Sequence, residues 1–516
     1  MFATRAVVVN EGARRAWLFL ASWRGVVAFA LAMGAQWLLR EAAPGTPFAP
    51  SSASQWFVTH APGWLATEAI DRLGHRALPT LEGGAILSAL GLGALLRRAR
   101  PLVLAVAALA LTLTAVYLDP ISHGSRSTLE AALVGGGAAG ATAYALSPRA
   151  ANPARTDASP VQRLDPGRRH LVITTCLGLG LLGLGGAAVL RQVFRSVTST
   201  FVLADRPLNV PVDPSFPEVP KLSSRVTSNK DHYVVDIDLD HPVLSEDDWQ
   251  LTVGGLVENR LALSLEALRR LYSAEHLITL TCISNPVGGP LVGNARWTGV
   301  SLSSLLDMAR PTAEARAVVA RAADDYSETI PLDVVARDAP VVAFGMNGVL
   351  LPREHGYPAR LLHPGRYGMR SVKWLTDLTL TSDQGAQGYW EKRGWDRQAV
   401  VRTGSRFDTP QYGSEVESPF TCAGIAWAGA RGIQGVEISS DDGKTWYPAT
   451  LEGELSQLAW RRWVKVLELP PGRYLLEVRA IDGSGAVQQE ARQPPHPSGA
   501  TGYHRVLVEV TGGSGG

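Results

Sequence analysis

Cysteine is the residue type in this chain whose placement could support metal chemistry. The 516 residues contain three, Cys176, Cys282 and Cys422, and only Cys282 lies where an apolar strand ends and a loop rich in glycine and proline begins. A thiolate in such a loop is a good ligand for a soft metal. No CxxC, CxxCH or zinc-type Cys/His spacing occurs. A disulfide framework is therefore not expected, and iron–sulfur clusters and c-type haem are excluded. Spacing alone leaves copper, zinc and a buried unreactive thiol open for Cys282.

The segments around Cys282 predict a mixed α+β domain. Ser264 and Ser301 precede apolar helical patterns as N-caps, which predicts helices over 264–272 and 301–308. Four segments have the composition of strands, namely 249–253, 277–280, 341–344 and 374–381. We expect a largely antiparallel or mixed sheet that presents Cys282 at a strand end.

The last hundred residues predict a second kind of fold. Segments 435–439 and 445–447 flank an Asp-Gly turn, and 472–483 is a long strand that ends in another such turn. A closing strand is predicted over 506–510. Short strands at regular spacing with turn signals indicate an immunoglobulin-like β-sandwich.

The first 190 residues differ in composition from the rest. They are rich in Ala, Leu, Gly and Val and poor in acids, although the whole chain has a net charge of only +2. Five apolar stretches approach the length needed to cross a hydrocarbon core of about 30 Å. They are 17–39, 81–96, 101–118, 129–146 and 171–190. We expect an α-helical membrane bundle of about five transmembrane helices, or four because the second stretch is short and the fourth is thin, with lipid as a partner.

The distribution of arginine predicts the orientation of this bundle. Arginines gather before the first stretch, between the second and third, and between the fourth and fifth, so these loops should be cytoplasmic. Everything after residue 190 would then lie outside the cytoplasm, in a multi-pass protein of a bacterial cell membrane. Arg168 and Arg169 directly precede the fifth stretch and match a twin-arginine export signal for folded, cofactor-loaded domains. Ordinary positive-inside flanking is the alternative.

Two segments are predicted to lack a fold of their own. Residues 191–225 contain prolines at 207, 211, 214, 217 and 220, a composition that favours an extended linker. Residues 512–516 are predicted to be a flexible tail.

Several ordered motifs after residue 225 carry a family resemblance. Residues 279–299, 346–348, 355–360, 364–365 and 371–374 resemble the sulfite oxidase family of molybdopterin-dependent oxidoreductases, of a membrane-anchored bacterial type. Residues 426–427, 436–446 and 460–463 resemble the dimerisation domain of that family. The resemblance implies a molybdopterin-binding catalytic domain over 226–405 and an immunoglobulin-like dimerisation domain over 406–511. It also implies Mo-molybdopterin, the molybdenum cofactor, and a homodimer.

The resemblance assigns roles to individual residues. Cys282 would be the protein ligand of molybdenum, and Tyr326 would lie beside the oxo group of the metal, where a phenol can take part in proton-coupled transfer. The residues expected to bind the cofactor with Cys282 are Asn229, Tyr233, Asp324, His355, Arg360, Ser371, Val372 and Lys373. Arg and Lys suit a phosphate, and Asp and His can pair with ring nitrogens. Without the resemblance, His355 could be a loop-capping residue, and Arg360 and Lys373 could be solvated surface charges.

The residues next to Cys282 and Tyr233 depart from the sulfite-oxidising pattern. Such relatives have an arginine after the cysteine and another after the tyrosine, whereas this chain has Ile283 and Val234. Positive charge could come instead from Arg366, Arg370, Arg402 or Arg406.

We expect two-electron oxygen-atom transfer at an extracytoplasmic molybdenum centre with a small-molecule oxo-acceptor or oxo-donor as substrate. An S-oxide or N-oxide reductase of the methionine sulfoxide reductase type, fed by membrane electrons, is the alternative, and a non-enzymatic membrane assembly protein is the second. No haem-binding segment is visible, so a quinone or a cytochrome is expected as electron carrier. No nucleic-acid partner is expected.

Overall fold

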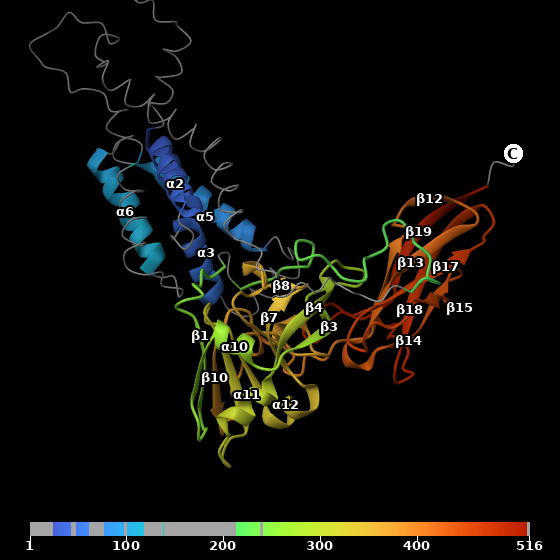
Figure 1. Cartoon of the computed structure of the whole chain (residues 1–516). Helices are drawn as coiled ribbons and strands as arrows, with labels where there is room; N and C mark the ends of the chain where they lie inside the picture. Colours follow the sequence, from blue (N-terminus) through green and yellow to red (C-terminus); the bar gives the residue numbers. More distant parts are fainter. Residues whose placement is uncertain are drawn as a thin grey trace, which may run out of the picture. The chain divides into compact units, whose positions relative to one another are not determined.

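Four segments near the N-terminus form helices in the computed structural model, which describes residues 24–42, 48–60, 77–96, 101–117, 138, 213–237 and 241–512 (Figure 1). These helices belong to one compact unit, and residues 244–512 belong to another. The helices are α2 (Arg24–Ala42), α3 (Ala49–His60), α5 (Ala77–Leu95) and α6 (Pro101–Tyr117). Small residues such as Ala28, Ala32 and Ala108 pack with Phe29 and Leu104 in the bundle core.

The expected membrane spans are only partly tested. Stretches 17–39, 81–96 and 101–118 overlap α2, α5 and α6, so their helical nature is confirmed for the described residues. None of the described helices combines the length and the apolar character that a membrane crossing requires. The stretches 129–146, apart from Ala138, and 171–190 lie outside the described residues, as do Arg168, Arg169 and Cys176.

Two sheets build the first domain of the second unit. One sheet has the order β3 (Ala274–Thr281), β4 (Val292–Ser301), β7 (Val341–Met346) and β8 (Val349–Leu350), and β9 (Arg360–Leu362) also pairs with β7. The other has the order β2 (Leu261–Ser264), β1 (Gln250–Gly255), β10 (Leu375–Thr381), β5 (Ala317–Ala322) and β6 (Ser327–Pro331). Only β1 and β10 pair in parallel in this second sheet. The predicted mixed α+β architecture is confirmed.

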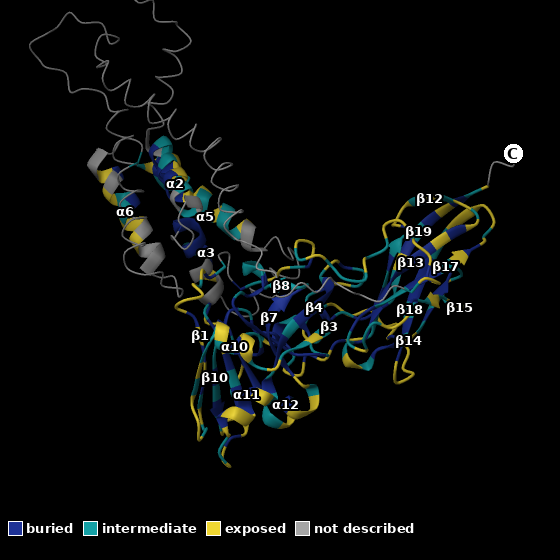
Figure 2. Ribbon diagram, viewed as in Figure 1, coloured by how far each residue is buried: buried dark blue, intermediate teal, exposed yellow. Residues whose placement is uncertain are grey.

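The helices of this domain begin where the sequence predicts. Ser264 caps α10 (Leu265–Arg270) by accepting a hydrogen bond from the Ala267 amide, and Ser301 caps α11 (Leu302–Ala309) through the Ser304 amide. A third helix, α12 (Leu332–Asp338), follows β6. Figure 2 shows a buried interior between these helices and the sheets, where Leu251, Leu302 and Val318 are fully buried.

The C-terminal domain is a two-sheet sandwich, as predicted. One sheet contains β11 (Gly404–Thr409), β13 (Phe420–Trp427), β17 (Arg461–Leu467) and β16 (Thr450–Leu451), in that order. The other contains β12 (Ser414–Glu417), β19 (His504–Thr511), β18 (Gly472–Asp482), β14 (Ile433–Ser439) and β15 (Tyr447–Pro448). Trp463 is fully buried among the residues of its core. The predicted boundary between 405 and 406 falls inside β11, so the sandwich begins slightly earlier than expected.

The described end of the proline-rich linker packs on this sandwich. The side chain of Phe216 is buried against Ala423 and Val464, and the Asp213 carboxylate accepts a hydrogen bond of 2.9 Å from the Gly453 amide. Residues 213–225 form no helix or strand, which agrees with the prediction, but they do not stand free of the sandwich.

Candidate functional site

Cys282 follows the last residue of β3 and opens a tightly bonded loop. Its amide donates to the Leu291 carbonyl at 3.0 Å, and its carbonyl accepts from the Asn285 amide at 3.1 Å. The Asn285 side chain accepts from the Leu291 amide and closes the loop across its base. These bonds hold the thiol in place at the end of the strand, where it is 8% exposed.

The thiol of Cys282 has little support for its ionised form from the protein alone. Its Sγ lies 3.0 Å from Ser284 Oγ, and burial raises the pKa of the Cys282 thiol despite this contact. A bound metal cation would reverse this effect, because a coordinating thiol is deprotonated by the charge of the metal. The geometry therefore suits a metal ligand better than a free nucleophile.

Tyr233 reaches the backbone beside Cys282. A Cβ atom on Gly368 would lie 2.6 Å from Tyr233 Oη and 3.5 Å from the Thr281 carbonyl, so the phenol, this glycine and the end of β3 meet at one point. Burial, followed by the nearby charge of Cys282, raises the pKa of Tyr233. Gly368 leaves the space that the phenol needs, since any side chain there would collide with it.

Two largely buried cations, Arg360 and Lys373, interact electrostatically with Tyr233 and Cys282, respectively. Arg360, at the start of β9, donates to the His355 carbonyl at 3.0 Å, and its Cζ lies 5.0 Å from the centre of the Trp297 ring. Its Nε is buried and has no hydrogen-bond partner among the described residues. Lys373 donates to the Glu354 carbonyl at 3.0 Å and forms an ion pair with Asp236. Burial lowers the pKa of Arg360 to about 10, so it remains a cation at neutral pH.

Two histidines lie near Arg360 and Lys373. His355, at the end of the short helix η4 (Arg353–His355), donates through Nε2 to the Asn229 carbonyl at 2.6 Å. His232 packs edge-on to His355 and stacked on Tyr233, with ring centres 5.4 and 5.2 Å apart. Burial lowers the pKa of His355 to about 4 and that of His232 to about 3. Both rings are therefore neutral at physiological pH.

Asp324 supplies a carboxyl of unusual basicity. Its Oδ1 accepts from the Tyr326 amide at 3.2 Å. Burial, with a smaller contribution from the Asp236 carboxylate, raises the pKa of Asp324 to about 7, although Lys373 opposes the shift. At neutral pH this carboxyl can therefore donate as well as accept a proton.

The remaining residues predicted to bind the cofactor, Ser371, Val372 and Asn229, make hydrogen bonds within the protein. The Ser371 hydroxyl accepts from the His363 amide at 3.2 Å, and the Val372 side chain lies in the core while its carbonyl accepts from the Leu361 amide. The Asn229 carboxamide oxygen accepts from Asn347 at 2.7 Å.

The electrostatic environment links most of the predicted residues. Charge–charge interactions connect Cys282 with Tyr233 and with Lys373. Lys373 interacts in the same way with Arg360 and Asp324. Arg360 in turn interacts with His232 and His355. Sequence reasoning missed His232 and Asp236 in this group. His232 lies directly before Tyr233, and Asp236 three residues beyond it, so an extension of that segment could have found both.

Tyr326 belongs to a buried hydrogen-bond network. Its hydroxyl lies 2.5 Å from the Met369 carbonyl and 3.1 Å from Glu328 Oε1. The Glu328 carboxylate accepts from the phenol and also pairs with Arg370, while burial raises the pKa of Glu328 to about 7. These contacts make Tyr326 a support for the short helix η5 (Gly368–Arg370). Its role beside a metal stays a prediction.

Three of the four arginines considered for substrate binding are paired with carboxylates. Arg366 pairs with Asp338 at 2.7 Å and Arg406 with Asp408 at 2.9 Å. The buried Arg370 pairs with Glu328 and, at 2.6 Å, with Glu391. Arg402 is exposed and has no carboxylate partner among the described residues; its amide donates to the Tyr367 hydroxyl at 3.2 Å. It lines a cavity of about 30 Å³ together with Thr281 and Tyr367, which has room for about one water molecule.

Comparisons with known proteins cover the second unit. Residues 238–390 match the oxidoreductase molybdopterin binding domain, and residues 397–511 match the Mo-co oxidoreductase dimerisation domain. The mitochondrial sulfite oxidase of Rattus norvegicus is 31% identical over 326 residues, 52% of this chain and 59% of that protein. The NADPH nitrate reductase of Fusarium oxysporum is 30% identical over 259 residues, 40% of this chain and 28% of that protein.

One solved structure resembles this chain over a similar extent. It is the sulfane dehydrogenase SoxCD of Paracoccus pantotrophus, which has a TM-score of 0.49 and 23% identity over 62% of this chain and 92% of that chain. The chain spans less than two thirds of the length of the curated relatives above.

Proposed function

Residues 238–511 belong to the sulfite oxidase family of molybdopterin-dependent oxidoreductases, with Mo-molybdopterin as cofactor, and we propose from this that the chain catalyses two-electron oxygen-atom transfer to or from a small molecule. One observation carries the proposal. Cys282 directly follows β3, and its charge interacts with the Tyr233 phenol and with the largely buried Lys373. One thiol, one phenol and one cation therefore lie near one another.

The residues present fit the cofactor. Arg360 and Lys373 would hold its phosphate, because both are largely buried cations and Arg360 Nε has no hydrogen-bond partner among the described residues. Asp324, His355 and Tyr233 would contact the edges of the pterin. Cys282 would bind the metal as thiolate. When bound, the cofactor supplies the two-electron redox and oxygen-transfer chemistry, and the protein supplies placement and a shaped pocket.

Proton positions in the site follow from burial. His355 is neutral and uses Nε2–H on the Asn229 carbonyl, which leaves Nδ1 as an acceptor. Asp324, with a pKa of about 7, can be held neutral and donate to a ring nitrogen. The two side chains thus offer one acceptor and one donor to a heterocycle without placing a net charge against it.

An S-oxide or N-oxide reductase is favoured over a sulfite oxidase by the residues near Cys282. Ile283 is buried in an apolar cluster with Tyr367 and Trp395, and Arg366, Arg370 and Arg406 are engaged by carboxylates. Of the four arginines considered, this leaves Arg402 alone without a carboxylate partner among the described residues. A dianion such as sulfite would need more than one unpaired positive charge, whereas an S–O or N–O dipole on an uncharged body suits an apolar wall.

Paired activity assays on the full-length, molybdenum-loaded protein test the proposal. Sulfite oxidation with an artificial acceptor and methionine sulfoxide reduction with a reduced viologen dye should be measured side by side. We expect turnover with the sulfoxide and little with sulfite. Faster turnover of sulfite would reverse the substrate assignment, and a molybdenum-loaded protein inactive with both classes would contradict the enzymatic proposal.

We also propose that the N-terminal unit anchors the chain to a bacterial cell membrane with the catalytic part outside the cytoplasm. The arginine distribution supports this orientation, and large apolar side chains on α5 and α6 are exposed, among them Leu87 (69%), Leu95 (83%) and Val106 (54%). Export by Arg168 and Arg169, and a quinone or cytochrome as electron carrier, belong to the same proposal. Sodium carbonate extraction tests the anchoring: the chain should stay in the membrane pellet, and complete release would contradict it.

A further inference from the structure

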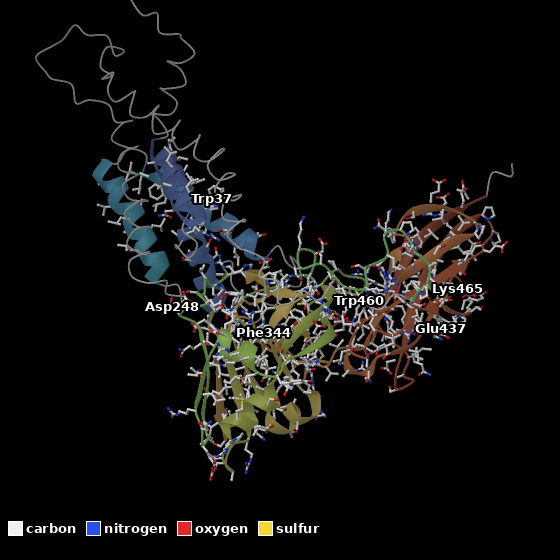
Figure 3. The ribbon with its side chains drawn as sticks, in the orientation of Figure 1. Trp37, Asp248, Phe344, Glu437, Trp460 and Lys465 are labelled. Atoms are coloured by element: carbon white, nitrogen blue, oxygen red, sulfur yellow. The ribbon has the colours of Figure 1, made fainter. Side chains whose placement is uncertain are left out.

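A second cavity lies on the face of β4 that points away from the cofactor residues. Its volume is about 620 Å³, within the range of small-molecule sites. The residues that matter for its chemistry are Arg269, Ser273, Arg296, Thr298, Phe344 and Gly348. They come from α10 and the segment after it, from β4, from β7 and from the turn before β8. Phe344, on β7, is labelled in Figure 3.

Strand alternation separates this cavity from the site of Cys282. Successive side chains of a strand point to opposite faces. Trp297 packs beneath Arg360 and beside His232, so its face of β4 belongs to the cofactor site. Arg296 and Thr298 must then point to the other face, where both line the cavity. The same strand therefore serves two sites, and Arg296 belongs to the one that the cofactor does not use.

Arg296 is buried with an incomplete set of partners. It is 7% exposed, and its Nη1 donates to Glu275 at 3.2 Å. Its Nε and Nη2 are buried and have no hydrogen-bond partner among the described residues. A Cβ on Gly348 would lie 3.2 Å from Nη2, so a side chain at this position would crowd the guanidinium. Unsatisfied buried donors on a cation are costly, and a ligand that accepts from them would remove the cost.

The charge around the cavity is positive. Arg270 is paired with Glu266 on α10, and Arg296 with Glu275 at the start of β3. Arg269 also lines the cavity and forms no ion pair with a carboxylate among the described residues. The cavity therefore has one uncompensated positive charge, with the hydroxyls of Ser273 and Thr298 beside it and the ring of Phe344 in its wall.

We propose that this cavity binds a soluble organic anion whose phosphate or carboxylate group sits on Arg296 and Arg269. Arginine presents paired donors that match either group. The cavity is far larger than an inorganic ion needs, so the ligand has an apolar body that lies against β4 and β7 near Phe344. The site does not depend on the proposed oxygen-transfer activity, since none of its residues belongs to the cofactor site.

Isothermal titration of the full-length, cofactor-loaded protein with phenyl phosphate tests the proposal, with inorganic phosphate and benzoate as partial probes. We expect saturable binding of phenyl phosphate, weaker binding of inorganic phosphate, and weakening of at least tenfold in Arg296→Gln and several-fold in Arg269→Gln. Arg321→Gln is the matched control, because Arg321 is half exposed and pairs with Asp377 on the other sheet; its affinity should be unchanged.

The exposed Arg269 keeps the test valid if Arg296→Gln fails to fold. Wild-type affinity in Arg269→Gln, or no binding of phenyl phosphate and benzoate by the unmodified protein, would overturn the proposal. Retained affinity in Cys282→Ser would confirm that the cavity, and not the substrate pocket, is being measured.

Discussion

Cys282 gains its chemistry from its surroundings and not from an intrinsically reactive thiol. Burial raises the pKa of its thiol, and the hydroxyl of Ser284 contacts its Sγ. Lys373 favours the thiolate but is itself paired with Asp236. At the scale of single residues, a bound metal cation would supply the positive charge that stabilises the Cys282 thiolate.

Replacing Cys282 with Ser should abolish turnover with either substrate class. The hydroxyl is a hard and weakly acidic ligand where a soft thiolate is required, while the nearly identical shape should leave the fold intact. Steady-state assays on protein of known molybdenum content provide the measurement. Cys422→Ala is the matched control, because this buried thiol lies in the core of the sandwich and its loss should leave turnover per folded molecule unchanged. Undiminished activity of Cys282→Ser with full molybdenum would refute the ligand assignment.

Asp324 should make the cofactor-free protein sensitive to pH. Its pKa rises from 3.8 in the unfolded chain to about 7 in the folded protein because burial disfavours the charged form. Its contribution to stability is therefore fully present below pH ~4 and is lost as the pH rises through about 7. The free energy of unfolding of the wild type relative to Asp324→Asn should fall across this interval. Glu328, with a similar shift, remains in both proteins and cancels in the comparison. A difference that does not change between pH 4 and 8 would show that Asp324 is charged when folded.

At the scale of elements, the short helix η5 connects two parts of the site. Gly368 lies against the Tyr233 phenol, the Met369 carbonyl accepts from Tyr326, and Arg370 pairs with Glu328 and Glu391. Ser371 to Lys373 follow directly. The buried network from β6 to η5 thus positions the segment that carries Lys373.

Tyr326→Phe should lower stability and cofactor retention together. The variant leaves the Met369 carbonyl without its donor in a buried setting, a loss of about 1–3 kcal/mol. Thermal unfolding and molybdenum content, measured on the same preparation, provide the test. If Tyr326 acts only on substrate, turnover will fall while both of these quantities match the wild type, and the positioning role would then be wrong.

The strands and helices around the site could largely be predicted from the sequence, whereas the side-chain contacts within the site could not. The strands around 277–280 and 374–381 and the caps Ser264 and Ser301 depend on local patterns, and the structure contains them. The pairing of Lys373 with Asp236 joins residues far apart in sequence, and no local pattern encodes such a pair. The contacts of Tyr326 with Glu328 and Met369 likewise depend on how β6 and η5 pack together.

At the scale of the whole molecule, the catalytic domain and the sandwich make one compact unit with shared contacts near Cys282. Arg406 donates to the Gly289 carbonyl at 2.8 Å, and Gly288 faces His504, where a Cβ would come within 2.3 Å of the ring. The sandwich therefore supports the cysteine loop in addition to any role in association.

The full-length chain should associate as a homodimer, as its match to the dimerisation domain indicates. Chemical crosslinking at low protein concentration should yield a species of about twice the 55.1 kDa chain mass. A product that remains monomeric across the concentrations used for the assays would contradict this expectation.

Quantification of molybdenum and pterin in the purified full-length protein tests the central claim most directly. The account predicts about one molybdenum and one pterin per chain in the wild type, because we propose that Arg360, Lys373 and Cys282 belong to a single cofactor site. Protein that is folded and contains neither molybdenum nor pterin, when produced in cells that supply both, would contradict the account.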